Sequence, residues 1–209
     1  MAERLEQITG VVLAGGRSSR FGSNKALASL GGRTLVERAA DALSAVFQKI
    51  LLVTNSPEEY AFLGIPMISD LIPGKGPLSG LHAALSRSET PRIFLVACDM
   101  PVLDRRLIEA MALMDAPEPV IVPRFSGRLQ PLHAIYSRSL LPLAERLLKG
   151  EGQQLKMAAL LGQVPCRIVE EDEIRAIVGE DLADRPNPFV NINRRQELEA
   201  LSKRLKAQD

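Results

Sequence analysis

Short runs of β-branched and aromatic residues alternate along this chain with longer segments of helical periodicity. The strand candidates are Ile8–Leu13, Ile50–Thr54, Ile65–Ser69, Arg92–Ala97, Val120–Val122 and His133–Tyr136. The helix candidates are Thr34–Phe47, Pro77–Ser88, Arg105–Met114, a segment from beyond Ser137 to Lys149, and a last helix that begins at Arg194. Strands that alternate with helices predict a mostly parallel sheet covered by helices. We therefore expect an α/β fold.

The length of 209 residues fits one domain better than two, so we expect residues 1–209 to form a single domain. A content of 46% hydrophobic and 24% charged residues is ordinary for a globular protein. The segment 170–187 is acidic, contains Pro186 and is followed by Pro188. We interpret it as a mobile surface segment, because too little chain follows it to build another domain.

Charge and cysteine usage argue against several classes of protein. Lys and Arg number 26 against 25 Asp and Glu, so the broad basic surface typical of nucleic-acid or membrane-surface binding is absent. No apolar run approaches the ~20 residues that cross a bilayer, and the N-terminal sequence lacks the apolar core of a secretory signal. Cys98 and Cys166 lie far apart without a CxxC pair, which favours neither disulfides nor zinc. We expect a cytoplasmic protein without nucleic-acid or membrane partners.

The segment Leu13–Lys25 has the composition of a loop that binds nucleotide phosphates. Gly15 and Gly16 follow the first strand directly, and glycines let backbone N–H groups approach phosphate oxygens. The cationic residues and the last glycine of the segment are Arg17, Arg20, Lys25 and Gly22. Cations neutralise a triphosphate, whereas the alternative is an ordinary turn with solvated basic residues. Neither GxxxxGK[ST] nor GxGxxG is present, which argues against a nicotinamide-dependent oxidoreductase.

Polar and glycine-rich loops follow the first four strand candidates. They begin at Ala14, Asn55, Asp70 and Cys98. Ligands of open α/β sheets bind at this carboxyl edge, so we expect the site there. Asp99 suits a magnesium ion, which takes one or two protein carboxylates beside substrate phosphates, although a turn aspartate is the alternative.

Several further residues are candidates with a competing structural interpretation. The loop from Asp70 through Gly76 to Gly80 has the composition of a turn shaped around a ligand, and a plain surface turn competes with that interpretation. The Asn55 amide suits a base or ribose edge, or it satisfies the turn. His133 and His82 fit structural positions better than acid–base roles. Asn193 and Gln196 resemble a helix-capping pair, which leaves Asn191 as the better ligand candidate.

Five motifs span almost the whole chain. They are Leu13-Ala-Gly-Gly16 with Arg20, Gly22 and Lys25; Gly76-Pro-Leu-Ser-Gly80; Cys98-Asp-Met-Pro101; Pro131-Leu-His-Ala134; and Asn191-Ile-Asn193. Together they resemble the molybdenum cofactor guanylyltransferase family. The first and third are shared widely among nucleotidyltransferases, and the later ones narrow the resemblance to the molybdopterin branch. The resemblance implies a Rossmann-like, three-layer α/β/α fold of the nucleotide-diphospho-sugar transferase kind.

The resemblance also implies transfer of GMP from magnesium–GTP to the terminal phosphate of molybdopterin, with release of pyrophosphate. Residues implied to hold GTP or cofactor are Leu13, Ala14, Gly15, Gly16, Lys25, Asn55, Asp70, Gly76, Gly80 and Asp99, with Asn191 and Asn193 towards the pterin. Lys25, Arg20 and Asp99 would act on the reacting phosphate, and Asp99 would bind Mg²⁺. Because the attacking phosphate is already anionic, placement and charge neutralisation suffice and no general base is needed. Proteins that deliver the cofactor, or molybdoenzymes that accept it, are further expected partners.

One segment departs from the family pattern. Family members often carry arginine after the helix that ends here near Gly150, where this chain reads Gly-Glu-Gly-Gln-Gln-Leu-Lys over 150–156. Lys156 or Arg128 would then meet the acceptor phosphate. Alternative functions are a cytidylyltransferase on the same pterin, a guanylyltransferase on another phosphorylated metabolite, and a nucleotide-binding module without catalysis.

Overall fold

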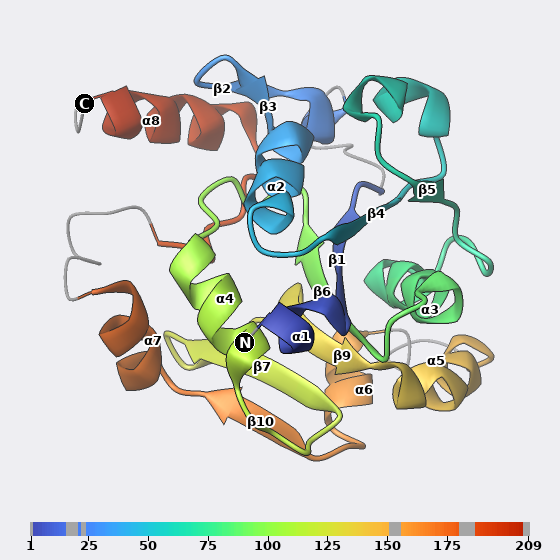
Figure 1. Ribbon diagram of the computed structural model, residues 1–209. Helices are drawn as coiled ribbons and strands as arrows, with labels where there is room; N and C mark the ends of the chain where they lie inside the picture. The colour runs from blue at the N-terminus through green and yellow to red at the C-terminus, as the bar shows by residue number, and fades with distance from the viewer. Residues whose placement is uncertain (1, 16–20, 22–23, 151–155, 180–186, 207–209) are drawn as a thin grey trace.

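The structure is a computed structural model, and it describes residues 2–15, 21, 24–150, 156–179 and 187–206. Its centre is a sheet with the strand order β10-β7-β9-β6-β1-β4-β5, and β8 pairs with β7 (Figure 1). The strands are β1 Ile8–Leu13, β4 Lys49–Val53, β5 Met67–Ile68, β6 Arg92–Ala97, β7 Val120–Phe125, β8 Arg128–Leu129, β9 His133–Ser137 and β10 Cys166–Val169. Within the path, β9 runs antiparallel to β6 and β7, and the other neighbouring strands pair in parallel. The expected α/β fold with a mostly parallel sheet is confirmed.

Helices cover both faces of this sheet. One face carries α2 Leu35–Ser44, α4 Arg105–Leu113 and α7 Glu171–Val178, and the other carries α3 Pro77–Arg87, α5 Leu141–Leu148 and α6 Met157–Leu161 (Figure 1). Shorter elements are α1 Ala2–Glu6 and the 3-10 helices η1 Lys25–Leu27, η2 Pro57–Leu63 and η3 Arg138–Leu140. The three-layer α/β/α architecture is therefore confirmed. No helix of the described residues has the length and apolar character needed to cross a membrane.

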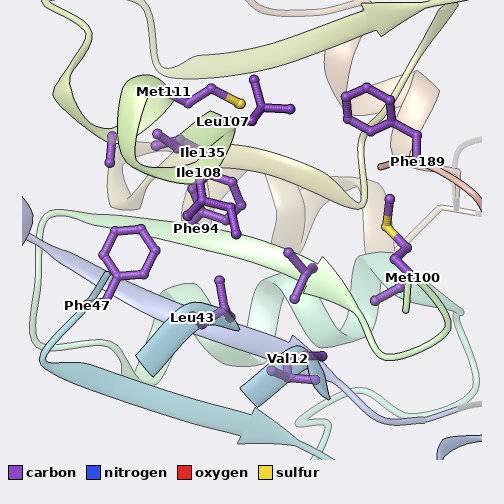
Figure 2. Packing of buried hydrophobic residues seen from close by; sticks show 14 of the residues in the cluster. Val12, Leu43, Phe47, Phe94, Met100, Leu107, Ile108, Met111, Ile135 and Phe189 are labelled. Atoms are coloured by element: carbon purple, nitrogen blue, oxygen red, sulfur yellow. The ribbon is translucent and has the colours of Figure 1, made fainter. Parts of the chain in front are cut away.

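The central strands are mostly apolar because both faces of the sheet are covered. Every residue of β1 is buried, and so are residues 93–97 of β6. Figure 2 shows the layer beneath α2 and α4, where Leu43 and Phe47 pack with Phe94, Ile108 and their neighbours. The continuous apolar runs that predicted these strands thus reflect burial on two sides.

Local capping fixes where α2 begins. The Thr34 hydroxyl accepts a hydrogen bond from the backbone N–H of Glu37, and the Glu37 carboxylate accepts one from the Thr34 N–H at 2.7 Å. The Thr34 hydroxyl also lies 2.7 Å from Oε2 of Glu37 in donor geometry, and this bond, together with the one from the Thr34 backbone N–H, lowers the pKa of Glu37. This capping box ends the preceding hairpin of β2 Ser29–Leu30 and β3 Arg33–Thr34 and starts the helix.

The C-terminal part of the chain returns to the carboxyl edge of the sheet. The last helix, α8 Arg195–Lys206, lies beside the β2–β3 hairpin (Figure 1), where Leu198 and Leu201 pack with Leu30, Leu35 and Ile192. Residues 187–193, here called the C-terminal strap, precede this helix. The backbone N–H of Ile192 donates to the carbonyl oxygen of Asp99 at 2.9 Å. The packing of α8 therefore places the strap directly beside Asp99.

The interpretation of 170–187 as a surface connection is wrong for its first half. Residues Glu171–Val178 form α7, and Ile174 and Val178 are buried in the core on the face shared with α4. Glu170 caps the helix through a capping box with Glu173. The acidic composition concealed two apolar positions spaced four residues apart, which suffice for a helix that buries only one side. Residues 180–186 lie outside the described residues.

Gly10 in β1 leaves room for the helix layer above it. A Cβ at this position would lie 2.8 Å from Cδ1 of Ile50 and 3.1 Å from Cβ of Leu43. We expect Gly10→Ala to lower the free energy of unfolding by about 1–3 kcal/mol, because overpacking a close-packed core costs that much. Urea unfolding measures the change. Gly162→Ala is the control: Gly162 caps α6 with a φ of −71° and has its nearest atom at 3.4 Å, so we expect a change within about 0.5 kcal/mol. Equal stability of the Gly10 variant and the control would contradict this packing argument.

Candidate active site

Four parallel strands, β1, β4, β5 and β6, end at one edge of the sheet and open onto a cavity of about 1470 Å³. The predicted site residues that line it are Leu13, Ala14, Gly15, Lys25, Asn55, Asp70, Gly76, Gly80, Asp99 and Asn193. Gly16 and Arg20 lie outside the described residues, so the structure says nothing of their positions. The loops that sequence reasoning placed at the carboxyl edge thus meet in one cavity.

The start of the phosphate loop is held between two neighbouring strands. The N–H of Ala14 donates to the carbonyl oxygen of Val53 at 2.9 Å, and the N–H of Cys98 donates to that of Leu13 at 3.0 Å. These hydrogen bonds continue the parallel ladders by one residue past the strand ends. They fix the backbone at Ala14 at the entrance to the loop, beside the residue that precedes Asp99.

Lys25 and Asp99 form an ion pair at the centre of the cavity wall. Nζ of Lys25 lies 2.7 Å from Oδ2 of Asp99, and the two side chains are only 16% and 20% exposed. Nζ also donates to Oδ1 of Asn193 at 3.2 Å. A lysine with little exposure beside glycine loops suits a polyanionic ligand, because water screens its charge less, and the carboxylate suits a cation that accompanies such a ligand.

The second oxygen of Asp99 is the atom best suited to a metal ion. Oδ1 is buried and accepts no hydrogen bond from any described residue. A buried carboxylate oxygen without a donor is costly unless a ligand satisfies it. The described residues contain no group of three or more His, Cys, Asp or Glu side chains that could enclose a metal ion. A lone carboxylate fits Mg²⁺, which is held by one or two carboxylates together with substrate phosphates and water.

Asn55 and Asp70 bind each other across the ends of β4 and β5. The Asn55 amide donates to Oδ2 of Asp70 at 2.9 Å and accepts from the Asp70 backbone N–H at 3.0 Å. Both residues line the cavity. This pairing orients the Asp70 carboxylate and leaves its other oxygen to accept hydrogen bonds from a ligand.

The second glycine loop ends at the N-terminus of α3. Gly76 is the N-cap residue with a φ of 69°, a backbone conformation that side chains other than glycine rarely adopt. No side chain caps the helix at this position, and Gly76 and Pro77 line the cavity. Gly80 lies one turn further, where a Cβ would lie 2.8 Å from Cδ2 of Leu13. Gly80 therefore allows α3 to approach β1, and the positive end of the α3 dipole faces the cavity.

The capping of α8 differs from the expected pairing of Asn193 with Gln196. The carboxylate of Glu197, and not Gln196, caps the start of α8: it accepts from the N–H of Asn193 at 2.6 Å and from that of Arg194 at 3.0 Å. The Asn193 side chain is thereby left for Lys25, and Asn193 lines the cavity. Asn191 is exposed and does not line it. Capping by Glu197 was not predicted, because the sequence does not distinguish a carboxylate that caps the first turn of a helix from one that is simply solvated.

The two residues considered for the acceptor phosphate lie outside this cavity. Lys156 is the exposed residue before α6, and Arg128 is exposed in β8. Neither side chain lines the cavity around Lys25 and Asp99. Their role in acceptor binding remains a prediction.

Both histidines and Cys98 are buried parts of the core, as the structural interpretation predicts. The ring of His133 lies between Phe94 and Phe189, with centroid distances of 5.2 and 5.1 Å. Burial lowers the pKa of His133 to about 3, so the imidazole is neutral at physiological pH. Burial raises the pKa of the Cys98 thiol to about 12, which rules out a thiolate nucleophile there at neutral pH. His82 is buried on α3.

The buried His133 makes stability depend on pH in a definite direction. Below pH 6.5 the unfolded chain binds a proton at this imidazole, whereas the folded chain does not until about pH 3. The unfolded state is therefore favoured as the pH falls, by up to about 1.4 kcal/mol per pH unit. We expect the free energy of unfolding to fall more steeply between pH 6.5 and 5 in the unaltered protein than in His133→Phe. Urea unfolding at both pH values tests this, and parallel pH dependences of the two proteins would contradict it.

Three further residues of the cavity wall were not predicted from the sequence. Asn24, Glu59 and Tyr60 line the cavity, and the Asn24 side chain bonds to each of the other two. Asn24 precedes Lys25, a predicted site residue. An asparagine directly before a short helix is a common N-cap, and this signal could have identified Asn24 from the sequence. Glu59 and Tyr60 lie on η2, whose irregular pattern carries no periodic signal.

Fold and site together define a nucleotidyltransferase, in which a glycine-rich loop, a lysine and a carboxylate meet at the carboxyl edge of a mostly parallel sheet. Residues 10–165 match the MobA-like NTP transferase domain family. The chain is 34% identical to the molybdenum cofactor guanylyltransferase of Desulfosudis oleivorans, covering 97% of this chain and 98% of that protein. It is 37% identical to the probable molybdenum cofactor guanylyltransferase of Pelotomaculum thermopropionicum, covering 90% and 88%.

The fold is also shared with a solved structure. Molybdopterin-guanine dinucleotide biosynthesis protein A from Archaeoglobus fulgidus superposes with a TM-score of 0.79 at 24% identity, covering 96% of this chain and all of that one. This likeness concerns the fold. On the sequence relatives and the family match, the chain belongs to the molybdenum cofactor guanylyltransferase family.

Proposed function

We propose that this protein transfers GMP from GTP to the terminal phosphate of molybdopterin and releases pyrophosphate. The observation that carries the proposal is the ion pair of Lys25 and Asp99 in the cavity at the carboxyl edge, in a chain of this family. Residues 1–209 act as one nucleotidyltransferase domain in this account. The substrates are then GTP and the pterin.

The residues present fit a magnesium ion on Asp99. Its buried Oδ1, which accepts no hydrogen bond from a described residue, is the atom that would hold the ion. When bound there, Mg²⁺ would neutralise triphosphate charge and favour departure of pyrophosphate. Lys25 binds the triphosphate from the same wall and offsets the charge that develops at the α-phosphate. The N-terminus of α3, where Gly76 and Pro77 line the cavity, adds a positive dipole end.

Asn55 and Asp70 suit the guanine base. Guanine carries donors at N1 and N2, and the carboxylate of Asp70, oriented by Asn55, offers acceptors. Cytosine carries one donor group at that edge, the N4 amino group, beside the acceptors N3 and O2, so a carboxylate can accept from fewer donors there than on guanine. We therefore assign GTP rather than CTP as the donor.

Asn193 and the strap border the acceptor side. Asn193 bonds to Lys25, and the strap is anchored on the backbone of Asp99 through Ile192. An acceptor phosphate beside Asn193 would therefore face the same α-phosphate that Lys25 contacts. No described residue needs to act as a general base, because the attacking phosphate is already ionised.

Nucleotide choice and product formation test the proposal together. Purified protein is incubated with magnesium, molybdopterin and each of GTP, CTP, ATP and UTP separately, and the pterin products are identified by mass. We expect the guanine dinucleotide with GTP and little product with the others. A product with CTP and none with GTP would overturn the guanylyl assignment. Absence of product with every nucleotide would favour a binding module without catalysis.

A further inference from the structure

Asn24 connects the end of the phosphate loop to the segment that follows β4. Its Oδ1 accepts from the backbone N–H of Ala26 at 3.1 Å and so caps η1, which begins at Lys25. Its Nδ2 donates to Oε2 of Glu59 at 2.6 Å and to the hydroxyl of Tyr60 at 2.9 Å. The Tyr60 hydroxyl also lies 3.2 Å from Oδ1 of Asn24, in donor geometry. One amide side chain thus binds both the helical turn of Lys25 and η2.

The η2 side of this connection is firmly anchored. Tyr60 is 3% exposed, and its ring belongs to the core that α2 and α4 form on the sheet. Burial raises the pKa of Tyr60, so the hydroxyl is neutral and available both to accept and to donate. Glu59 contributes a charged acceptor, and hydrogen bonds to charged groups are stronger than neutral ones. Asn24 is therefore tied, through Tyr60, to the packed core.

We propose that Asn24, Glu59 and Tyr60 are positioning residues that hold Lys25 against Asp99 and the nucleotide triphosphate. This inference rests on the role proposed above for Lys25. Lys25 is the first residue of η1, so loss of the hydrogen bond by which Asn24 caps η1 would displace the backbone of Lys25 directly. Displacements of about 1 Å at a reacting phosphate cost up to about 10²-fold in rate. Three residues that hold Lys25 in place would therefore have a large effect on the rate.

The hydrogen-bond pattern explains why an amide stands at position 24. The side chain must accept from the Ala26 N–H and donate to the Glu59 carboxylate at the same time. Aspartate would keep the first bond and lose the second, and it would place two carboxylates within 2.6 Å of each other. Glutamine at position 59 would restore a donor to that aspartate. The pair Asn24→Asp and Glu59→Gln therefore exchanges donor and acceptor without changing the size of either side chain.

The test measures GTP affinity by equilibrium titration, and kcat for GMP transfer, in the unaltered protein, a single variant, a double variant and a matched control. We expect Asn24→Asp to weaken GTP binding and to lower kcat, each by about tenfold. Asn24→Asp combined with Glu59→Gln should recover most of both. The matched control combines Asn24→Asp with Glu58→Gln, because Glu58 is an exposed neighbour on η2 that does not line the cavity. It should recover neither. Equal recovery by both double variants would overturn the proposal.

Coupling to Lys25 distinguishes positioning from a general structural role. If Asn24 acts through Lys25, Asn24→Asp should change GTP affinity by less than about twofold when Lys25 is already Ala, since coupled residues are not additive. Full additivity in a normally folded double variant would overturn the inference while leaving GMP transfer by the unaltered protein intact. Coupled GTP binding without any transfer would instead overturn the proposed function and support the positioning role.

Discussion

Replacement of Asp99 by Asn is expected to lower kcat about 10³-fold at saturating GTP and magnesium. Asn keeps the shape of the side chain but removes the charge that pairs with Lys25 and would hold the metal ion. Loss of a metal contact at a reacting phosphate costs several kcal/mol of transition-state stabilisation, and each 1.4 kcal/mol is tenfold in rate. Steady-state assays of pyrophosphate release measure the change.

Asp104→Asn is the matched control for that experiment. Asp104 is also an aspartate, five residues further on, but it caps α4 and pairs with Arg106 outside the cavity. Asparagine is an equally good cap, so we expect kcat within about twofold of the unaltered protein. A near-normal kcat for Asp99→Asn with magnesium would show that Asp99 is only a turn residue.

Replacement of Lys25 by Ala should lower kcat/KM by about 10²-fold or more. The Lys25 side chain is only 16% exposed, so the attraction of its ammonium group for phosphate is less screened than that of a surface lysine. Removal of a single preorganised cation or donor at developing charge typically costs 10²–10³-fold, that is about 3–4 kcal/mol. The loss should appear mainly in kcat if Lys25 contacts the α-phosphate in the transition state, and mainly in KM if it only holds the ground-state triphosphate.

Lys49→Ala provides the comparison for Lys25. Lys49 lies at the start of β4 and pairs with Glu89 on the surface, away from the cavity. Its side chain is 53% exposed, and pairs of this kind contribute little to stability. We expect unchanged kinetics. Equal kinetics of Lys25→Ala and Lys49→Ala would show that Lys25 has no role in the reaction.

The elements that could be predicted from the sequence are those that pack against apolar layers on both faces of the sheet. The strand Arg92–Ala97 was predicted with the bounds it has in the structure, because five of its six residues are buried. The parallel arrangement then brought the ends of four strands to one edge, which placed Asn55, Asp70 and Asp99 in one cavity without any knowledge of their side-chain contacts. Topology, rather than local pattern, made that part of the site predictable.

The unpredicted parts depend on contacts between distant segments. The strands β2, β3 and β8 have two residues each, which is too short for a periodic signal. The link from Asn24 to Glu59 and Tyr60 spans about 35 positions along the chain and depends on where η2 returns. The cap that Glu197 provides in place of Gln196, and the bond from Lys25 to the Asn193 side chain, depend on which groups lie within reach of one another. Tertiary geometry, and not the local sequence, determines these contacts.

The fate of the α-phosphorus of GTP tests the central claim most directly. Two reactions are run with magnesium and molybdopterin, one with GTP labelled at the α-phosphorus and one with GTP labelled at the γ-phosphorus. Transfer of GMP predicts that the α-label enters the pterin product and that the γ-label leaves in pyrophosphate. The α-label remaining in free nucleotide, with the γ-label in inorganic phosphate or on the pterin, would contradict the assignment of this cavity as a guanylyltransferase site.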